Sequence, residues 1–190
     1  MLRQIGARWV LPALTVMFLV GLGACTTTTI TPEFVQPAKQ SVHTVVVGDI
    51  TTSEELWQFY IPHIRHGLIN KLNESEAFEE VLASAPEMMP PGAVLITGQL
   101  TEIDKGSAAA RWIIGFGAGR AKARGEFMIS DDAGLMLARF QSWKAYSGGA
   151  GIGGAGFVDM EDLAEQLGQE TAGSVIRWSR GEALEPPKEE

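Results

Sequence analysis

Hydrophobic and polar positions along the chain predict five strands. Residues 42–50 form a nearly continuous run of β-branched residues, which is typical of a central strand. Residues 122–130 alternate between apolar and polar positions, which indicates a half-buried antiparallel strand. Three further strand-forming stretches, separated by residues that favour turns, lie at residues 77–83, 93–104 and 135–146.

Two other stretches carry a single apolar stripe at helical spacing. In the first, residues 52–73, Thr52 and Glu55 offer a capping box, and apolar side chains then recur every three or four positions. Pro62 lies within this stretch and predicts a kink or a late start of the helix. The second helix is expected to begin after Asp159, which is a suitable N-cap.

The order of these elements predicts an α+β domain with two layers. A strand, a helix and a strand come first, three strands follow as a meander, and a helix comes last, in the order β-α-β-β-β-β-α. Such an order favours a mixed sheet with both helices on one side of it. We therefore expect a four- to five-stranded sheet with two helices packed on one face.

The first 24 residues have the layout of a secretory signal peptide. Arg3 and Arg8 precede an apolar run of about 13 residues, which is shorter than the roughly 20 that a membrane-spanning helix needs. The run ends at Leu22-Gly23-Ala24-Cys25, which resembles the lipobox of bacterial lipoproteins. The resemblance implies cleavage before Cys25, a diacylglyceryl group on its sulfur, and often a fatty acid such as palmitate on the new amino group.

The alternative for the N-terminus is a soluble secreted protein with an incidental thiol, but Cys25 is the only cysteine and stands at the cleavage boundary. Two or three acyl chains would exceed the single chain that binds a membrane only marginally. By resemblance to the bacterial sorting rule, Thr26 after the cysteine favours the periplasmic side of the outer membrane. With Cys25 lipidated, the chain has no thiol left for a disulfide.

Composition divides the rest of the chain into three parts. Residues 25–40, rich in Thr and Pro, predict a flexible tether; residues 41–181 form one domain; and residues 182–190 predict a disordered tail. Removal of residues 1–24 would leave 13 basic and 23 acidic residues, a formal charge of −10. A chain this acidic does not suit nucleic acid, which requires a basic surface.

Several of these patterns together resemble a known family. They are the lipobox, Val45-Val46-Val47, the strand segment Val94-Leu95-Ile96-Thr97-Gly98, the basic and glycine-containing residues 120–125, Asp132-Ala133-Gly134, and the glycine-rich residues 148–156. The chain resembles the bacterial lipoprotein family known as domain of unknown function 4410. The resemblance implies a fold similar to the small α/β periplasmic domains of envelope-assembly lipoproteins, such as those of the curli secretion channel. It implies no catalytic residues.

A glycine-rich loop before the last helix is a candidate ligand site. Gly151, Gly153 and Gly156 match the GxGxxG pattern, whose backbone amides can approach a pyrophosphate at a helix N-terminus. The pattern lacks the following strand that such a unit requires, and Asp159 places negative charge where phosphate would lie. A loop without a ligand is the alternative.

A metal site is the other candidate. His63 and His66 could face one metal, but the sequence supplies no further ligand, so a pair of ordinary histidines is the alternative. We expect neither a metal nor a cofactor.

The meander predicts that the loops at residues 105–121 and 147–157 lie at the same end of the sheet. Residues 105–125 hold five basic residues and no acidic one, although the whole chain has a charge of −8. This apolar and basic tip could contact anionic lipid headgroups or an acidic partner, or it could fold into the core. Its members are Arg111, Trp112, Ile113, Ile114, Phe116, Arg120, Lys122 and Arg124.

These observations together favour a membrane-anchored periplasmic lipoprotein that is not an enzyme and acts as an interaction or envelope-assembly module. Its expected partners are the membrane, through Cys25, and a protein of the envelope. Two alternatives remain open. One is a binder of a nucleotide or another small anion at the 148–156 loop, with a possible enzymatic role, and the other is a subunit of an envelope ring or secretion complex.

Overall fold

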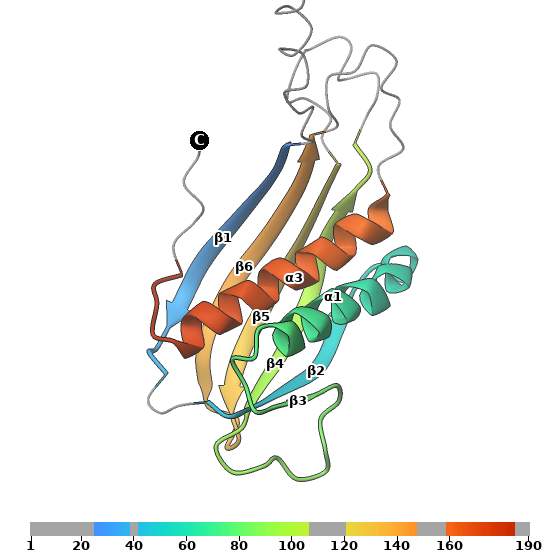
Figure 1. The fold of residues 1–190 in the computed structure, drawn as a ribbon. Helices are drawn as coiled ribbons and strands as arrows, with labels where there is room; N and C mark the ends of the chain where they lie inside the picture. Colours follow the sequence, from blue (N-terminus) through green and yellow to red (C-terminus); the bar gives the residue numbers. More distant parts are fainter. Residues whose placement is uncertain (1–24, 39–41, 107–120, 148–158, 185–190) are drawn as a thin grey trace, which may run out of the picture.

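The computed structural model describes residues 25–38, 42–106, 121–147 and 159–184, which form one mixed sheet with helices on one of its faces (Figure 1). The strands are β1 (Cys25–Val35), β2 (Thr44–Thr52), β3 (Glu80–Leu82), β4 (Val94–Asp104), β5 (Ala121–Asp131) and β6 (Met136–Ser147). Their order across the sheet is β1-β6-β5-β4-β2-β3. β2 runs parallel to β3 and β4, and the other neighbours are antiparallel.

The α+β class and the helices on one face are confirmed, but the sheet has six strands instead of four or five. The additional strand is β1, which covers most of the stretch that we expected to be a flexible tether. Its run of threonines is β-branched and favours extended backbone. Pro32 is tolerated because β1 is an edge strand, and the pairing shifts register between Pro32 and Phe34.

The helical layer contains a 3-10 helix, η1 (Glu55–Tyr60), and two α-helices, α1 (Ile61–Glu74) and α3 (Met160–Ser179). The late start expected at Pro62 is confirmed, because Pro62 lies in the first turn of α1. The capping box is not formed: the Thr52 hydroxyl accepts a hydrogen bond from the Glu54 amide at 3.2 Å instead. The Asp159 cap is confirmed.

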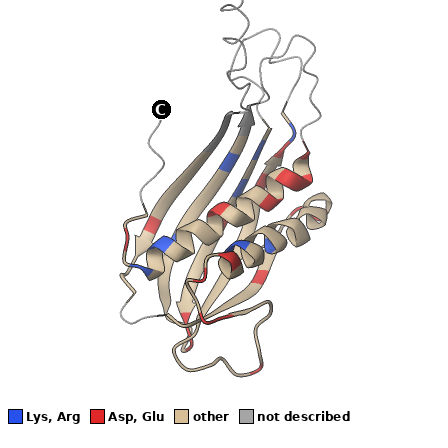
Figure 2. Cartoon of the chain, in the orientation of Figure 1, with Lys and Arg blue, Asp and Glu red and all other residues tan. Residues whose placement is uncertain are grey.

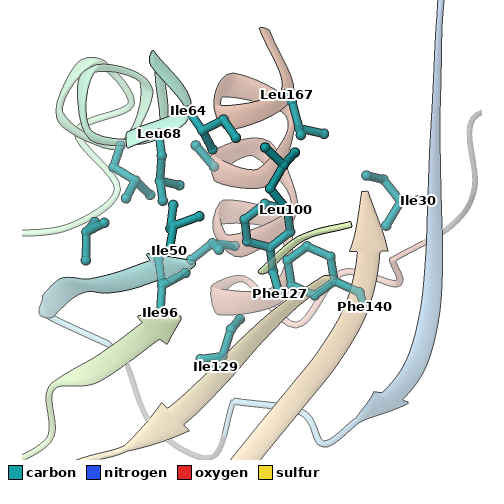
Figure 3. Packing of buried hydrophobic residues seen from close by; sticks show 14 of the residues in the cluster. Ile30, Ile50, Ile64, Leu68, Ile96, Leu100, Phe127, Ile129, Phe140 and Leu167 are labelled. Carbon is teal, nitrogen blue, oxygen red and sulfur yellow. The ribbon is translucent and has the colours of Figure 1, made fainter. Parts of the chain in front are cut away.

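The main hydrophobic core lies between the sheet and the two α-helices (Figure 3). The rings of Phe127 on β5 and Phe140 on β6 stack at its centre, with centroids 6.0 Å apart. Leu68 on α1 and Leu167 on α3 belong to the same core and are fully buried. Leu184 is also buried in this core, although residue 182 was the expected start of a disordered tail; residues 185–190 lie outside the described part.

Glycine allows α1 and α3 to pack in direct backbone contact. A Cβ atom added at Gly168 would overlap the carbonyl oxygen of Ile64, and one added at Gly67 would overlap the carbonyl oxygen of Glu165. Both oxygens belong to the backbone. A change of side-chain rotamer therefore cannot relieve either overlap. The two helices run in the same direction across the sheet (Figure 1).

We predict that Gly168→Ala lowers the free energy of unfolding by about 1–3 kcal/mol, because the added methyl group forces the two helices apart. Gly173→Ala is the matched control on the same helix, since a Cβ there meets only the Arg177 side chain, at 3.7 Å. It should leave stability unchanged or raise it by up to about 1 kcal/mol through better helix propensity. Urea unfolding of both variants tests this, and equal stability would contradict the close contact.

Candidate functional site

Cys25 is the first residue of β1 and lies at one end of the sheet, beside Ser147 at the end of β6. The end of β4 and the start of β5 lie at nearly the same level as the start of β1. Asp104 pairs with Lys122, Lys122 with Ala145, and Ala145 with Thr27. We call this region the Cys25 end of the sheet; its described members are Cys25, residues 104–106, residues 121–122 and Ser147. Figure 1 shows β4 and β6 ending at this end of the sheet.

A buried lysine joins β1 to the rest of the fold close to Cys25. The Lys144 side chain lies on the helix-facing side of β6 and is only 8% exposed. Its ammonium group donates hydrogen bonds to the Thr28 hydroxyl at 2.9 Å and to the Glu170 carboxylate of α3 at 2.8 Å. A buried charge requires such partners. Lys144 therefore connects β1, β6 and α3 at one point.

Further contacts hold β1 along its length. Ile30 is 1% exposed and enters the core beside Phe140 (Figure 3). After the strand, the backbone oxygen of Gln36 accepts a hydrogen bond from the indole of Trp178 at 2.8 Å. β1 is thus packed and hydrogen-bonded as a part of the domain.

Only two members of the predicted basic tip are in the described part of the chain. Lys122 and Arg124 alternate with buried residues of β5, so they lie on the face of the sheet that has no helices. Both are close to Glu102 of β4, with Lys122 at 2.5 Å and Arg124 at 3.7 Å. Their charges are therefore partly compensated. The other members lie outside the described residues: Arg111, Trp112, Ile113, Ile114, Phe116 and Arg120.

The glycines of the candidate ligand loop, Gly151, Gly153 and Gly156, also lie outside the described residues. The helix N-terminus that would hold a phosphate is described. There the Asp159 carboxylate accepts hydrogen bonds from the amides of Glu161 and Asp162, at 2.9 and 3.3 Å. Acidic residues, Glu161 and Asp162, lie in this first turn of α3, which Figure 2 colours red. The described geometry thus favours a self-capped helix over a phosphate site.

The two histidines considered as metal ligands face different carboxylates across the helix contact. His63 lies 3.7 Å from Glu161, and His66 lies 3.4 Å from Glu165. Among the described residues, no group of three or more His, Cys, Asp or Glu side chains is arranged to hold a metal. Each histidine therefore contributes to the contact between α1 and α3.

No α-helix in the described ranges is both long enough and apolar enough to cross a bilayer.

The family's sequence model matches residues 24–150, which is more than half of the chain. The protein therefore belongs to the family described as Domain of unknown function (DUF4410), and the resemblance seen in its motifs is confirmed. Among curated protein sequences, none is significantly similar to the chain.

Two solved structures of PelC from Paraburkholderia phytofirmans are similar to this chain in fold. The first, described as a dodecamer, has a TM-score of 0.51 and 12% identity, and the match covers 84% of this chain and 100% of that one. The second, a point variant that is also described as a dodecamer, has a TM-score of 0.51 and 14% identity, with coverages of 80% and 97%. At these identities the likeness shows a shared fold alone.

We predict a clear energetic coupling between Lys144 and Glu170. In a double-mutant cycle of Lys144→Met and Glu170→Gln, the coupling should be about 1–2 kcal/mol, because Lys144 is buried while Glu170 keeps some contact with water. The matched control is the exposed pair of Lys71 and Glu74, 3.8 Å apart on α1, where about 0.5 kcal/mol or less is expected. Urea unfolding measures both, and a coupling no larger than that of the control would refute the role assigned to Lys144.

Proposed function

We propose that this member of the DUF4410 family is a lipoprotein of a bacterial cell envelope, attached through Cys25 and acting as a non-catalytic assembly module. The observation that carries the proposal is the Leu22–Cys25 lipobox together with the position of Cys25 as the first residue of a folded strand. The proposed location is the periplasmic side of the outer membrane, which follows from Thr26 by the sorting rule.

The limits of the family match support this division of the chain. The match begins at residue 24, next to the proposed cleavage site, and so leaves nearly the whole signal-like segment outside the family. β1 then begins at Cys25. The first described strand therefore begins at the residue that would become the N-terminus of the mature protein.

The non-catalytic role is favoured by the chemistry of the chain. The only cysteine would be consumed by the lipid, which removes the one strong nucleophile. The ligand-loop alternative depends on a helix N-terminus at which Asp159 already occupies two amide donors. The loss of the Cys25 thiol and the occupied amides at Asp159 therefore favour lipid attachment and protein contact over a catalytic reaction or a bound nucleotide.

Replacement of the proposed lipidation residue tests this function directly. Cys25→Ser should abolish the mass increase from diacylglyceryl and acyl groups and leave the protein in the aqueous phase of a detergent partition, because a hydroxyl is too weak a nucleophile at this step. Mass spectrometry of protein extracted from cells measures the modification. Thr27→Ser is the neighbouring control and should stay lipidated. Unmodified wild-type protein would contradict the proposal.

A second candidate role, as a subunit of a ring, is favoured by two observations. The PelC structures that share the fold are dodecamers. In this chain, moreover, large apolar side chains are exposed at two separate places: Phe34 and Val35 on the edge strand β1 are 37% and 40% exposed, and Leu56 and Phe59 on η1, which follows β2, are 87% and 60% exposed. Three strands separate β1 from β2, and two different patches suit a head-to-tail contact, which forms a ring when its rotation closes.

We predict that the detergent-extracted protein forms a species of several subunits, measured by light scattering after size-exclusion chromatography. Leu56→Ser with Phe59→Ser should shift it to the monomer, because the change removes one apolar partner of the contact. Met88→Ser is the control: it removes an equally exposed apolar side chain, 85% exposed, from the loop between β3 and β4. A wild-type monomer at every concentration would exclude the ring.

A further inference from the structure

We propose that the Cys25 end of the sheet rests directly on the surface of the membrane, so that the strands rise from the bilayer and the turn between β5 and β6 is held away from it. This inference rests on the lipidation of Cys25 proposed above and adds an orientation to it. The partner of this end of the domain is a lipid surface.

The first reason is that no free segment separates the proposed anchor from the fold. Cys25 pairs with Ser147, and each following residue through Pro32 has its own partner on β6. A flexible segment of about 16 residues would let the domain move roughly 20–24 Å from its anchor. With Cys25 itself in the sheet, that freedom is removed, and the acyl chains begin where the strand begins.

The second reason is that β1 is fixed to the domain beside the anchor. Thr28, only three residues after Cys25, accepts the hydrogen bond from buried Lys144, which in turn pairs with Glu170. Ile30, two residues further on, is in the core. β1 is therefore rigidly connected to β6 and α3. Because of this connection, the orientation of β1 at the anchor sets the orientation of the domain.

The third reason is the chemistry of the neighbouring residues. Asp104 and Lys105 lie at the level of the first β1 residues and are exposed. Charged side chains do not enter hydrocarbon without a large cost, but they suit the hydrated headgroup layer. The described residues of the sheet end are therefore expected to rest on the headgroups, while the acyl chains of Cys25 enter the hydrocarbon.

The register then places the other end of the sheet. Val94, the first residue of β4, pairs with Asp131, and the β5–β6 turn follows at residues 132–135. β4 contains 11 residues, which corresponds to a length of roughly 33–36 Å. Lys105 and Ala133 thus mark opposite ends of the same strands, one beside the membrane and one remote from it.

Energy transfer to a labelled bilayer tests this orientation. Lys105→Cys and Ala133→Cys each place a reactive thiol at an exposed position, and each would be the only free thiol once the Cys25 sulfur carries lipid. The full-length lipidated protein is labelled with a donor dye and reconstituted into phosphatidylethanolamine–phosphatidylglycerol vesicles with an acceptor on the headgroups. Transfer from residue 105 should exceed transfer from residue 133 by about twofold or more, given the separation along the strands.

A variant with an inserted tether is the matched control. A flexible Gly-Ser segment of about 16 residues after Thr26 leaves Cys25 and its neighbour unchanged but separates the anchor from the sheet. The difference between the two label positions should then largely disappear. If transfer from residue 105 still exceeds transfer from residue 133 in this variant, direct anchoring at Cys25 is not the cause of the difference, and the proposed orientation is overturned.

Flotation of the vesicles separates the two proposals. If the two labelled variants, which keep Cys25 and carry no inserted tether, fail to float with the vesicles, the lipid anchor itself is wrong, and the orientation falls with it. If they float but transfer is equal at the two positions, or stronger at residue 133, the lipoprotein function stands and the orientation is overturned. Flotation with stronger transfer at residue 105, lost on insertion of the tether, supports both.

Discussion

The backbone contact between α1 and α3 determines how the helical layer lies on the sheet. Gly67 and Gly168 bring the two helices together with no side chain between them. The helices then cover the sheet as one unit, and Leu68 and Leu167 both reach the same core (Figure 3). This placement also brings Glu170 over β6, where it meets Lys144. The contact at Gly67 and Gly168 and the attachment of β1 are therefore linked through α3.

The core is apolar under the middle strands and polar beside β1. Phe127, Ile96 and Leu100 are buried in the hydrophobic cluster, whereas Lys144, Thr28 and Glu170 meet through charge-assisted hydrogen bonds. Such bonds depend on direction as well as distance. A slip of β1 by two residues that brought Ile30 to Lys144 would remove the hydroxyl that accepts its hydrogen bond. The polar layer thus disfavours that slip of β1.

Much of the fold follows from local patterns, since residues 42–50 and 122–130 show the periods of a buried and a half-buried strand. β1 was missed because runs of Thr and Pro occur both in tethers and in edge strands, and only pairing with β6 distinguishes them. In the site, alternation alone places Lys144 on the same face as Phe140, but the sequence gives no sign that Glu170 lies opposite. The bulge between Leu100 and Glu102 likewise brings Glu102 to Lys122 and Arg124 through a register that no local pattern reveals.

The position of β1 has a consequence for the order in which the sheet can be completed as the chain folds. β1 is the first described strand in the sequence, yet its neighbour in the sheet is β6, the last described strand. Cys25 meets Ser147, so the ladder between them cannot close until the whole chain through residue 147 is available. Contacts between such distant residues form slowly, because a long loop must close first. Until that closure, β1 has no strand partner, and the edge of β6 that faces it stays uncovered.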